Sequence, residues 1–209
     1  MSQARDAILT KLRAGNWSSP APKQAAAGGK PGPLPKLGAD RLAYFEAKLK
    51  NNVISSDRVS TAQGIADSVV GFFQQHQIPL QLCAVSHPLL KDLPWPATLS
   101  VKQGPVANKD LSVISVAAAA IAESGSVVML SSAETPTEAN FLPDNFVCIV
   151  EASMVFAHME DLWAWQRTQT DKPPAVINII SGPSRTADVE QTIQLGAHGP
   201  RRMHVIIKV

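Results

Sequence analysis

Short apolar runs separated by polar and glycine-rich segments recur along most of this chain. Runs of strand length occupy residues 52–56, 80–85, 97–101, 110–116, 127–131 and 146–150. Several are apolar on both faces, which is typical of strands buried in a parallel sheet. Helical spacing of apolar residues occurs at 39–52, from residue 60 onward, and at 161–168. Strands alternating with helices predict a three-layer α/β/α sandwich around a mostly parallel sheet.

The helix that begins near residue 60 has the clearest local signal. Ser60 and Gln63 have the spacing of a capping box, in which each side chain bonds the other residue's backbone N–H. Ile65, Val69 and Phe72 then share one apolar face.

The chain divides into three parts by composition. Residues 1–14 predict an amphipathic helix, residues 15–39 are a flexible linker rich in Ala, Gly, Pro and Lys, and residues 40–209 form a single domain. The linker cannot bury enough apolar area to fold alone. The first helix therefore docks either on this chain or on another subunit, so a homo-oligomer is left open.

Composition excludes several classes of function. The 209 residues carry a net charge of +2, with no basic stripe for nucleic acid and no apolar run long enough to span a membrane. The N-terminus lacks a signal-peptide core, which predicts a cytoplasmic protein. Cys83 and Cys148 lie in apolar runs and are expected to be buried, reduced thiols. No CxxC, CxxxC or HExxH spacing occurs, so no metal or iron–sulfur site is expected in this chain. No GxGxxG or P-loop motif occurs either, which argues against a standard dinucleotide-binding or P-loop enzyme.

Polar side chains concentrate near the C-terminus, in a segment (175–209) that reads as strand, turn, short helix, turn and strand. The first turn holds Ser181, Gly182, Ser184, Arg185, Thr186 and Asp188, where an open α/β sheet usually places its ligand site. Arg185 could hold an anionic group and Asp188 a hydroxyl or amine. Alternatively, Arg185 pairs internally with Asp188 or Glu190.

Two further groups are candidates for chemistry. His198, Arg201 and Arg202 occupy the second turn, which precedes the last strand and should lie at the sheet edge opposite Ser184. They would share a site with Arg185 only if that strand were antiparallel or a second subunit contributed; otherwise they face a partner or stabilise the turn. Glu123 is the other candidate. At the edge of the sheet, desolvation would raise its pKa and allow proton exchange; alternatively, it bonds backbone N–H groups of its own turn.

Two stretches carry a family resemblance. The run INIISGPSRTADVEQTIQLGAHGPRR, and AIAESGSVVML upstream of it, resemble the LUD-domain family of the lactate-utilisation protein C type over roughly residues 42–209. Ser124 and Ser126 stand where Thr is common in that family. The resemblance implies a fold similar to those of ribose-5-phosphate isomerase, glucosamine-6-phosphate deaminase and the CoA transferases.

The same resemblance implies a cytoplasmic subunit needed to oxidise L-lactate to pyruvate, with the iron–sulfur clusters in partner proteins and no cofactor in this chain. Arg185 would hold the lactate carboxylate, and Ser184, Thr186 or Asp188 its hydroxyl. A stand-alone isomerase or CoA-transferase-like enzyme that uses Glu123 is one alternative, and a non-catalytic assembly factor is another. His76, His87, His158 and His204 are interpreted as incidental.

Overall fold

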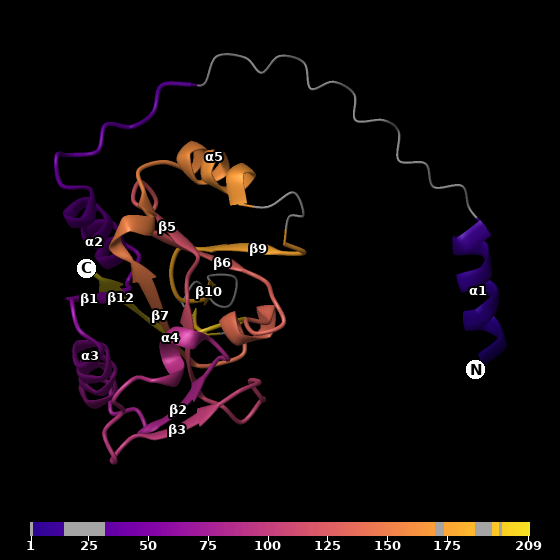
Figure 1. Cartoon of the computed structure of the whole chain (residues 1–209), viewed down its shortest axis with the longest axis horizontal. Helices are drawn as coiled ribbons and strands as arrows, with labels where there is room; N and C mark the ends of the chain where they lie inside the picture. The colour runs from indigo at the N-terminus through magenta and orange to yellow at the C-terminus, as the bar shows by residue number, and fades with distance from the viewer. Residues whose placement is uncertain (1, 15–31, 170–173, 187–193, 197) are drawn as a thin grey trace. The chain divides into compact units, whose positions relative to one another are not determined.

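The chain divides into two compact units, Met1–Leu34 and Pro35–Val209, each described here by itself (Figure 1). The structure, a computed structural model, describes residues 2–14, 32–169, 174–186, 194–196 and 198–209. The first unit contains helix α1 (Ser2–Ala14), on which Ile8 and Leu12 are exposed. Residues 15–31 of the expected linker lie outside the described residues.

Six parallel strands form the main sheet of the second unit, in the order β1-β12-β7-β4-β2-β3. They are β1 (Ser55–Val59), β2 (Gln81–Ala84), β3 (Ser100–Gln103), β4 (Ser112–Val116), β7 (Asn145–Glu151) and β12 (Arg202–Lys208). β7 and β12 are almost entirely buried, because both faces of the sheet are covered. That burial accounts for their uninterrupted apolar runs and confirms the predicted α/β fold with a parallel sheet.

Helices cover this sheet on both faces. Helix α3 (Ala62–Gln75) packs on one face together with α4 (Pro88–Lys91) and the 3₁₀ turn Thr137–Asn140. Helix α2 (Arg41–Asn51) packs on the other face beside a second sheet. The outer side of that second sheet is covered by α5 (Met159–Gln169), which follows the 3₁₀ turn Ala152–Met154 and lies above β5, β6 and β9 in Figure 1.

The second sheet is a feature that the sequence pattern did not predict. Its order is β8 (Val155–Phe156), β5 (Ala119–Ile121), β6 (Ser126–Leu130) and β9 (Ile177–Ile180), with β6 antiparallel to both neighbours. The expectation that the strand before Ser181 ends at an edge of the main parallel sheet is therefore wrong. An apolar run shows that a strand is buried but does not show which strand it pairs with.

Two local predictions are corrected. Helix α3 is capped by Thr61 rather than Ser60, because Thr61 keeps an extended backbone and its Oγ1 accepts the Gly64 N–H at 2.9 Å. Gln63 bonds Asp67 within the helix at 2.8 Å and does not complete a capping box.

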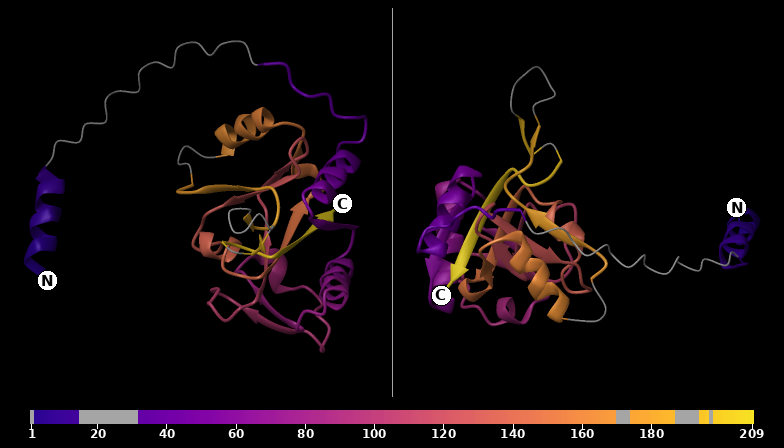
Figure 2. Two further views of the ribbon diagram at one scale, coloured as in Figure 1. Left: turned by 180° about the vertical axis from the view of Figure 1, so that it is seen from behind. Right: turned by 90° about the horizontal axis from the view of Figure 1, so that it is seen from above.

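The short helix expected to begin near Asp188 and Glu190 falls on residues 187–193, which lie outside the described residues. Arg185–Thr186 form strand β10, antiparallel to β11 (Gln194–Leu195). The Ser184 N–H donates to Pro200 O at 2.8 Å and Ser184 O accepts the Gly196 N–H at 2.9 Å, which closes the base of this hairpin. Figure 2 (right) shows strands β10 and β11 projecting from the rest of the domain. Asp188 lies outside the described residues.

Both cysteines are buried and unpaired, as expected. β4 separates β2, which carries Cys83, from β7, which carries Cys148. Burial raises the pKa of Cys148 to about 12, so its thiol stays protonated.

Candidate functional site

Three serine hydroxyls from the two family-like stretches form a continuous chain. Ser126 Oγ lies 2.7 Å from Ser124 Oγ and 2.6 Å from Ser181 Oγ. The contact follows from the second sheet: β6 begins at Ser126, and its next residue pairs with Ile180 of β9. The turn after β5 and the turn after β9 are thus brought together, although 55 positions separate Ser126 from Ser181.

The C-terminal end of α2 packs against both turns. Asn52 Nδ2 donates to Ser124 O at 2.8 Å. Gly125 has φ +65°, and a Cβ there would lie 2.8 Å from the backbone carbon of Lys48. Gly182 has φ +140°, and a Cβ there would lie 2.9 Å from Asn52 O. Glycine is therefore required at both positions, for its backbone conformation and for the close approach of α2.

A hollow of about 290 Å³ opens where these elements meet. It is lined by Asn51, Asn52, Ser181, Gly182, Pro183 and Arg185. Arg185 is exposed and one of its N–H groups, on Nη2, donates to Asn52 O at 3.0 Å. Three of the predicted site residues, Ser181, Gly182 and Arg185, therefore line one hollow. A guanidinium group and a hydroxyl in the same hollow suit a ligand with an anionic group and a neighbouring hydroxyl.

Other predicted residues lie elsewhere. Ser184 closes the hairpin, and its Oγ accepts the His198 N–H at 3.2 Å. His198 is thus beside Ser184, which corrects the expectation of opposite sheet edges; the error follows from assigning β9 to the main sheet. Thr186 is half-buried in β10.

Arg201 and Arg202 line a different hollow, described below. The Arg201 side chain packs against Gly196, and Arg202 Nη1 donates to Asn145 Oδ1 at 3.3 Å.

Glu123 faces α5 and is not among the residues that line the Arg185 hollow. Its Oε1 accepts the Met159 N–H at the first residue of α5, and its Oε2 lies 2.9 Å from His158 Nδ1. Burial acts to raise the pKa of Glu123, but the hydrogen bonds from His158 and Met159 outweigh it, so the pKa lies below its ordinary value. The raised pKa that proton exchange needs is absent at this carboxyl group.

A second histidine interpreted as incidental, His204, is the centre of a buried polar network. Its Nδ1 lies 2.8 Å from Ser55 Oγ and its Nε2 lies 2.9 Å from Ser68 Oγ, while the Ser68 hydroxyl donates to Asp57 Oδ2 at 2.7 Å. Since the one hydrogen of Ser68 goes to Asp57, Nε2 must be the donor, and in the neutral ring Nδ1 accepts from Ser55. A spacing of 136 positions between Ser68 and His204 left no sequence signal for this network.

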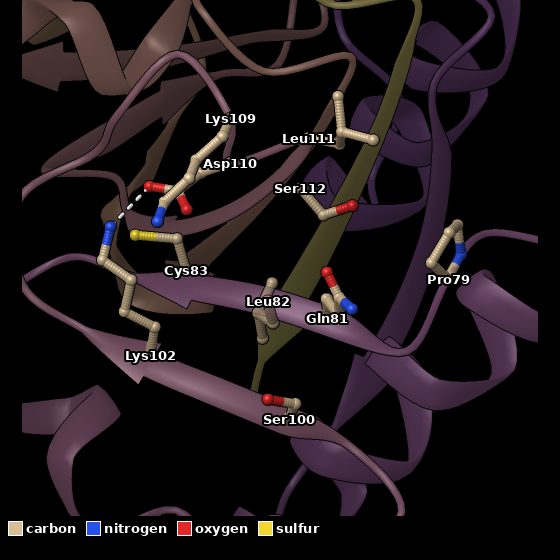
Figure 3. A pocket seen from close by; sticks show the side chains of 10 residues that line it. All are labelled: Pro79, Gln81, Leu82, Cys83, Ser100, Lys102, Lys109, Asp110, Leu111 and Ser112. Atoms are coloured by element: carbon tan, nitrogen blue, oxygen red, sulfur yellow. Dashed lines mark hydrogen bonds and ion pairs between the residues drawn. The ribbon is translucent and has the colours of Figure 1, made fainter.

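Two other hollows flank the main sheet. One, of about 330 Å³, holds the ion pair of Lys102 with Asp110 at 2.6 Å, and the Cys83 thiol beside it (Figure 3). Burial, together with the charge of Asp110, raises the pKa of Cys83, which leaves this thiol a poor nucleophile. The other, of about 460 Å³, is lined by Ser86 and His87 after β2 and by Ala117 after β4, at the carboxyl ends of these strands.

In the part of the chain that the structure describes, no cluster of three or more His, Cys, Asp or Glu side chains has the arrangement of a metal site. In the same part, no helix is both long and apolar enough to cross a membrane.

Comparison with known proteins gives the family. Residues 111–207, which include β4 to β12 and the Arg185 hairpin, match the family model of the LUD domain. This region of the chain matches the LUD domain, as the two sequence stretches indicated. A solved DUF162 family protein from Deinococcus radiodurans has a similar fold, with a TM-score of 0.62 and 18% identity over 84% of this chain and 100% of that one.

Two of the curated relatives described here share a name. Lactate utilization protein C of Geobacillus thermodenitrificans is 38% identical over 90 residues, which are 42% of this chain and 38% of the relative. The protein of that name from Geobacillus sp. WCH70 is 31% identical over 116 residues, or 54% of this chain and 48% of the relative. An uncharacterized Neisseria meningitidis protein is 30% identical over 86 residues, or 41% of this chain and 37% of the relative. The matched region thus spans less than half of each of these relatives.

Proposed function

We propose that this chain is the substrate-binding, non-redox subunit of an L-lactate utilisation system. The observation that carries the proposal is the Arg185 hollow, which lies at the C-terminal stretch of a LUD domain similar to lactate utilization protein C. L-Lactate carries a carboxylate next to a hydroxyl-bearing carbon. Arg185 would bind the carboxylate through parallel N–H groups, and Ser181 would contact the hydroxyl.

The reaction divides between this chain and its partners. Oxidation of L-lactate to pyruvate releases two electrons and two protons, and an amino-acid side chain is not a two-electron acceptor. We therefore assign the electrons to iron–sulfur partner proteins, with no cofactor in this chain and both steps in the cytoplasm. The alternative enzyme that uses Glu123 is less favoured, because that carboxylate caps α5 and its pKa is lowered.

The test is calorimetric titration of the full chain with L-lactate and pyruvate. Arg185→Ala removes a charge-assisted hydrogen bond to the carboxylate, typically about 1.5–3 kcal/mol, so affinity should fall roughly 10- to 150-fold. Arg185→Lys keeps the charge but loses the planar fork, and we expect an intermediate loss. Arg167→Ala, which removes an exposed arginine from α5, is the matched control and should leave affinity unchanged.

Two results would contradict the proposal. One is the absence of binding heat with either acid at millimolar concentration, which would favour an assembly role with an empty hollow. The other is turnover of lactate by the isolated chain with a dye acceptor, which would show that it carries its own redox chemistry.

A further inference from the structure

A second hollow, of about 400 Å³, lies at the amino ends of β1 and β12. Both strands begin there, at Ser55 and Arg202, and helices α2 and α3 end there, at Asn51 and Gln75. The residues that line it are Lys50, Val53, Ile54, Ser55, Phe72, Gln75, His76, Arg201, Arg202 and Met203. None of them belongs to the Arg185 hollow.

The charges around this hollow have one sign. Lys50, Arg201 and Arg202 are cationic, and no Asp or Glu is among the lining residues. Arg202 bonds the neutral amide oxygen of Asn145, and within the described residues neither Lys50 nor Arg201 forms an ion pair.

Three other cations of the same unit are neutralised by a carboxylate. Arg58 pairs with Glu46 at 2.6 Å, and Lys208 pairs with Glu151 at 2.8 Å. Lys102 likewise pairs with Asp110 in the hollow of Figure 3. What sets Lys50, Arg201 and Arg202 apart is that they line one hollow while none of them forms an ion pair within the described residues.

Helix dipoles do not account for all three charges. A helix C-terminus carries roughly half a negative charge, so the ends of α2 and α3 together call for about one cation. Lys48 and Lys50 already lie in the last turn of α2. The two guanidinium groups are in excess of that need.

The rest of the lining indicates what kind of anion fits. Val53 is exposed and supplies apolar surface, Phe72 and Met203 line the hollow but are largely buried, and Ser55 and Gln75 supply neutral hydrogen-bonding groups. Val53 has φ +60°, a costly conformation for a β-branched residue, and such strained residues cluster at functional sites. Burial, then the nearby charge of Arg202, lowers the pKa of His76, which makes the ring a neutral partner at pH 7.

We propose that this hollow binds a small organic phosphate monoester, with Lys50, Arg201 and Arg202 on the phosphate and Phe72, Val53 and Met203 on the organic part. A dianionic phosphate matches an excess of two to three positive charges, and guanidinium groups bind phosphate oxygens in a fixed fork. The site is distinct from the proposed lactate site and does not depend on it.

The test is calorimetric titration of the full chain with phenyl phosphate. Inorganic phosphate lacks the ring, phenol lacks the phosphate, and benzoate carries a carboxylate in place of the phosphate, so these three compounds serve as comparison ligands. Phenyl phosphate should bind more tightly than all three. Arg201→Gln and Lys50→Gln should each weaken it at least tenfold, equal to about 1.4 kcal/mol. Arg167→Gln removes one positive charge from α5 and should leave affinity unchanged, as should Arg185→Ala.

Equal affinity for benzoate and phenyl phosphate would overturn the assignment to a phosphate. No binding of phenyl phosphate, or an equal loss in Arg167→Gln, would overturn the site itself. Thermal unfolding of each variant without ligand shows whether the variant is folded. If Arg201→Gln does not fold, Arg201→Lys replaces it: this variant keeps the charge but loses the planar fork, so its affinity for phenyl phosphate should lie below that of the wild type. Because Arg185→Ala should weaken the binding of lactate and not that of phenyl phosphate, failure of one proposal leaves the other intact.

Discussion

At the scale of single residues, the Glu123 carboxylate stabilises the N-terminus of α5. It accepts an N–H from the first turn of α5 and a hydrogen bond from His158. A negative charge at a helix N-terminus is favourable, because it complements the positive end of the helix dipole. The ionised form is thus stabilised in the folded chain, which agrees with the lowered pKa.

Glu123→Gln keeps the shape of the side chain and removes its charge. We expect a loss of about 1–2 kcal/mol in unfolding free energy at pH 7. Because the folded-state pKa lies below the unfolded one, the carboxylate's contribution is complete above the unfolded value of about 4.5 and is lost as pH falls through the lower, folded value. Thermal melts should therefore differ at pH 7 and converge under acid conditions. A constant difference down to pH 3 would contradict this account.

The sequence predicted part of the site at this scale. Ser181, Gly182 and Arg185 line the same hollow, because residues of one turn are close in space wherever that turn lies. Asn52 and His158, which complete the contacts of Arg185 and Glu123, come from distant elements. No local pattern marks such partners, since their proximity depends on how β9 and α5 pack.

At the scale of elements, the β5–β6 hairpin joins the second sheet to α2. Its turn has room for only a hydrogen at Gly125, which packs against Lys48. The apolar runs predicted the central strands β4 and β7 because both of their faces are buried, and they also predicted β6 near residues 127–131. They did not predict β5 or the β10–β11 pair, because such short strands depend on tertiary pairing more than on propensity.

Gly125→Ala should destabilise the domain by roughly 1–3 kcal/mol, from an unfavourable φ and a clash with α2. That loss corresponds to about 2–4 °C in Tm per kcal/mol for a domain of this size. Gly71→Ala is the matched control: it lies on the exposed face of α3, and a Cβ there meets nothing within 4 Å. The control should raise stability by up to about 1 kcal/mol. Calorimetric melts of both variants measure the contrast, and a Gly125→Ala melt equal to wild type would refute the packing argument.

At the scale of the whole molecule, the apolar core clusters lie within Pro35–Val209. Leu37, inside the segment assigned to the linker, packs against the core cluster beneath α2. The predicted domain start at residue 40 stays a prediction, and this contact argues for an earlier one.

Two truncations locate the boundary. A chain of residues 35–209 should melt within about 2 °C of the full chain, because it keeps every core contact. A chain of residues 40–209 loses the partly buried Leu37 and should be less stable by about 1 kcal/mol. Equal melting temperatures for the two truncations would show that Leu37 adds nothing, and an unfolded 35–209 chain would show that the first unit is needed.

Strand β12 sets the order in which this molecule can assemble. β1 pairs with β12 alone, and Ser55 meets His204 across 149 positions. During synthesis on a ribosome, β1 and half of the His204 network must therefore wait until almost the entire described domain has been made. Contacts this distant in sequence slow folding. Until β12 is made, the unpaired edge of β1 is exposed to other nascent chains. We therefore expect slow translation of β12, or substitutions within it, to promote aggregation.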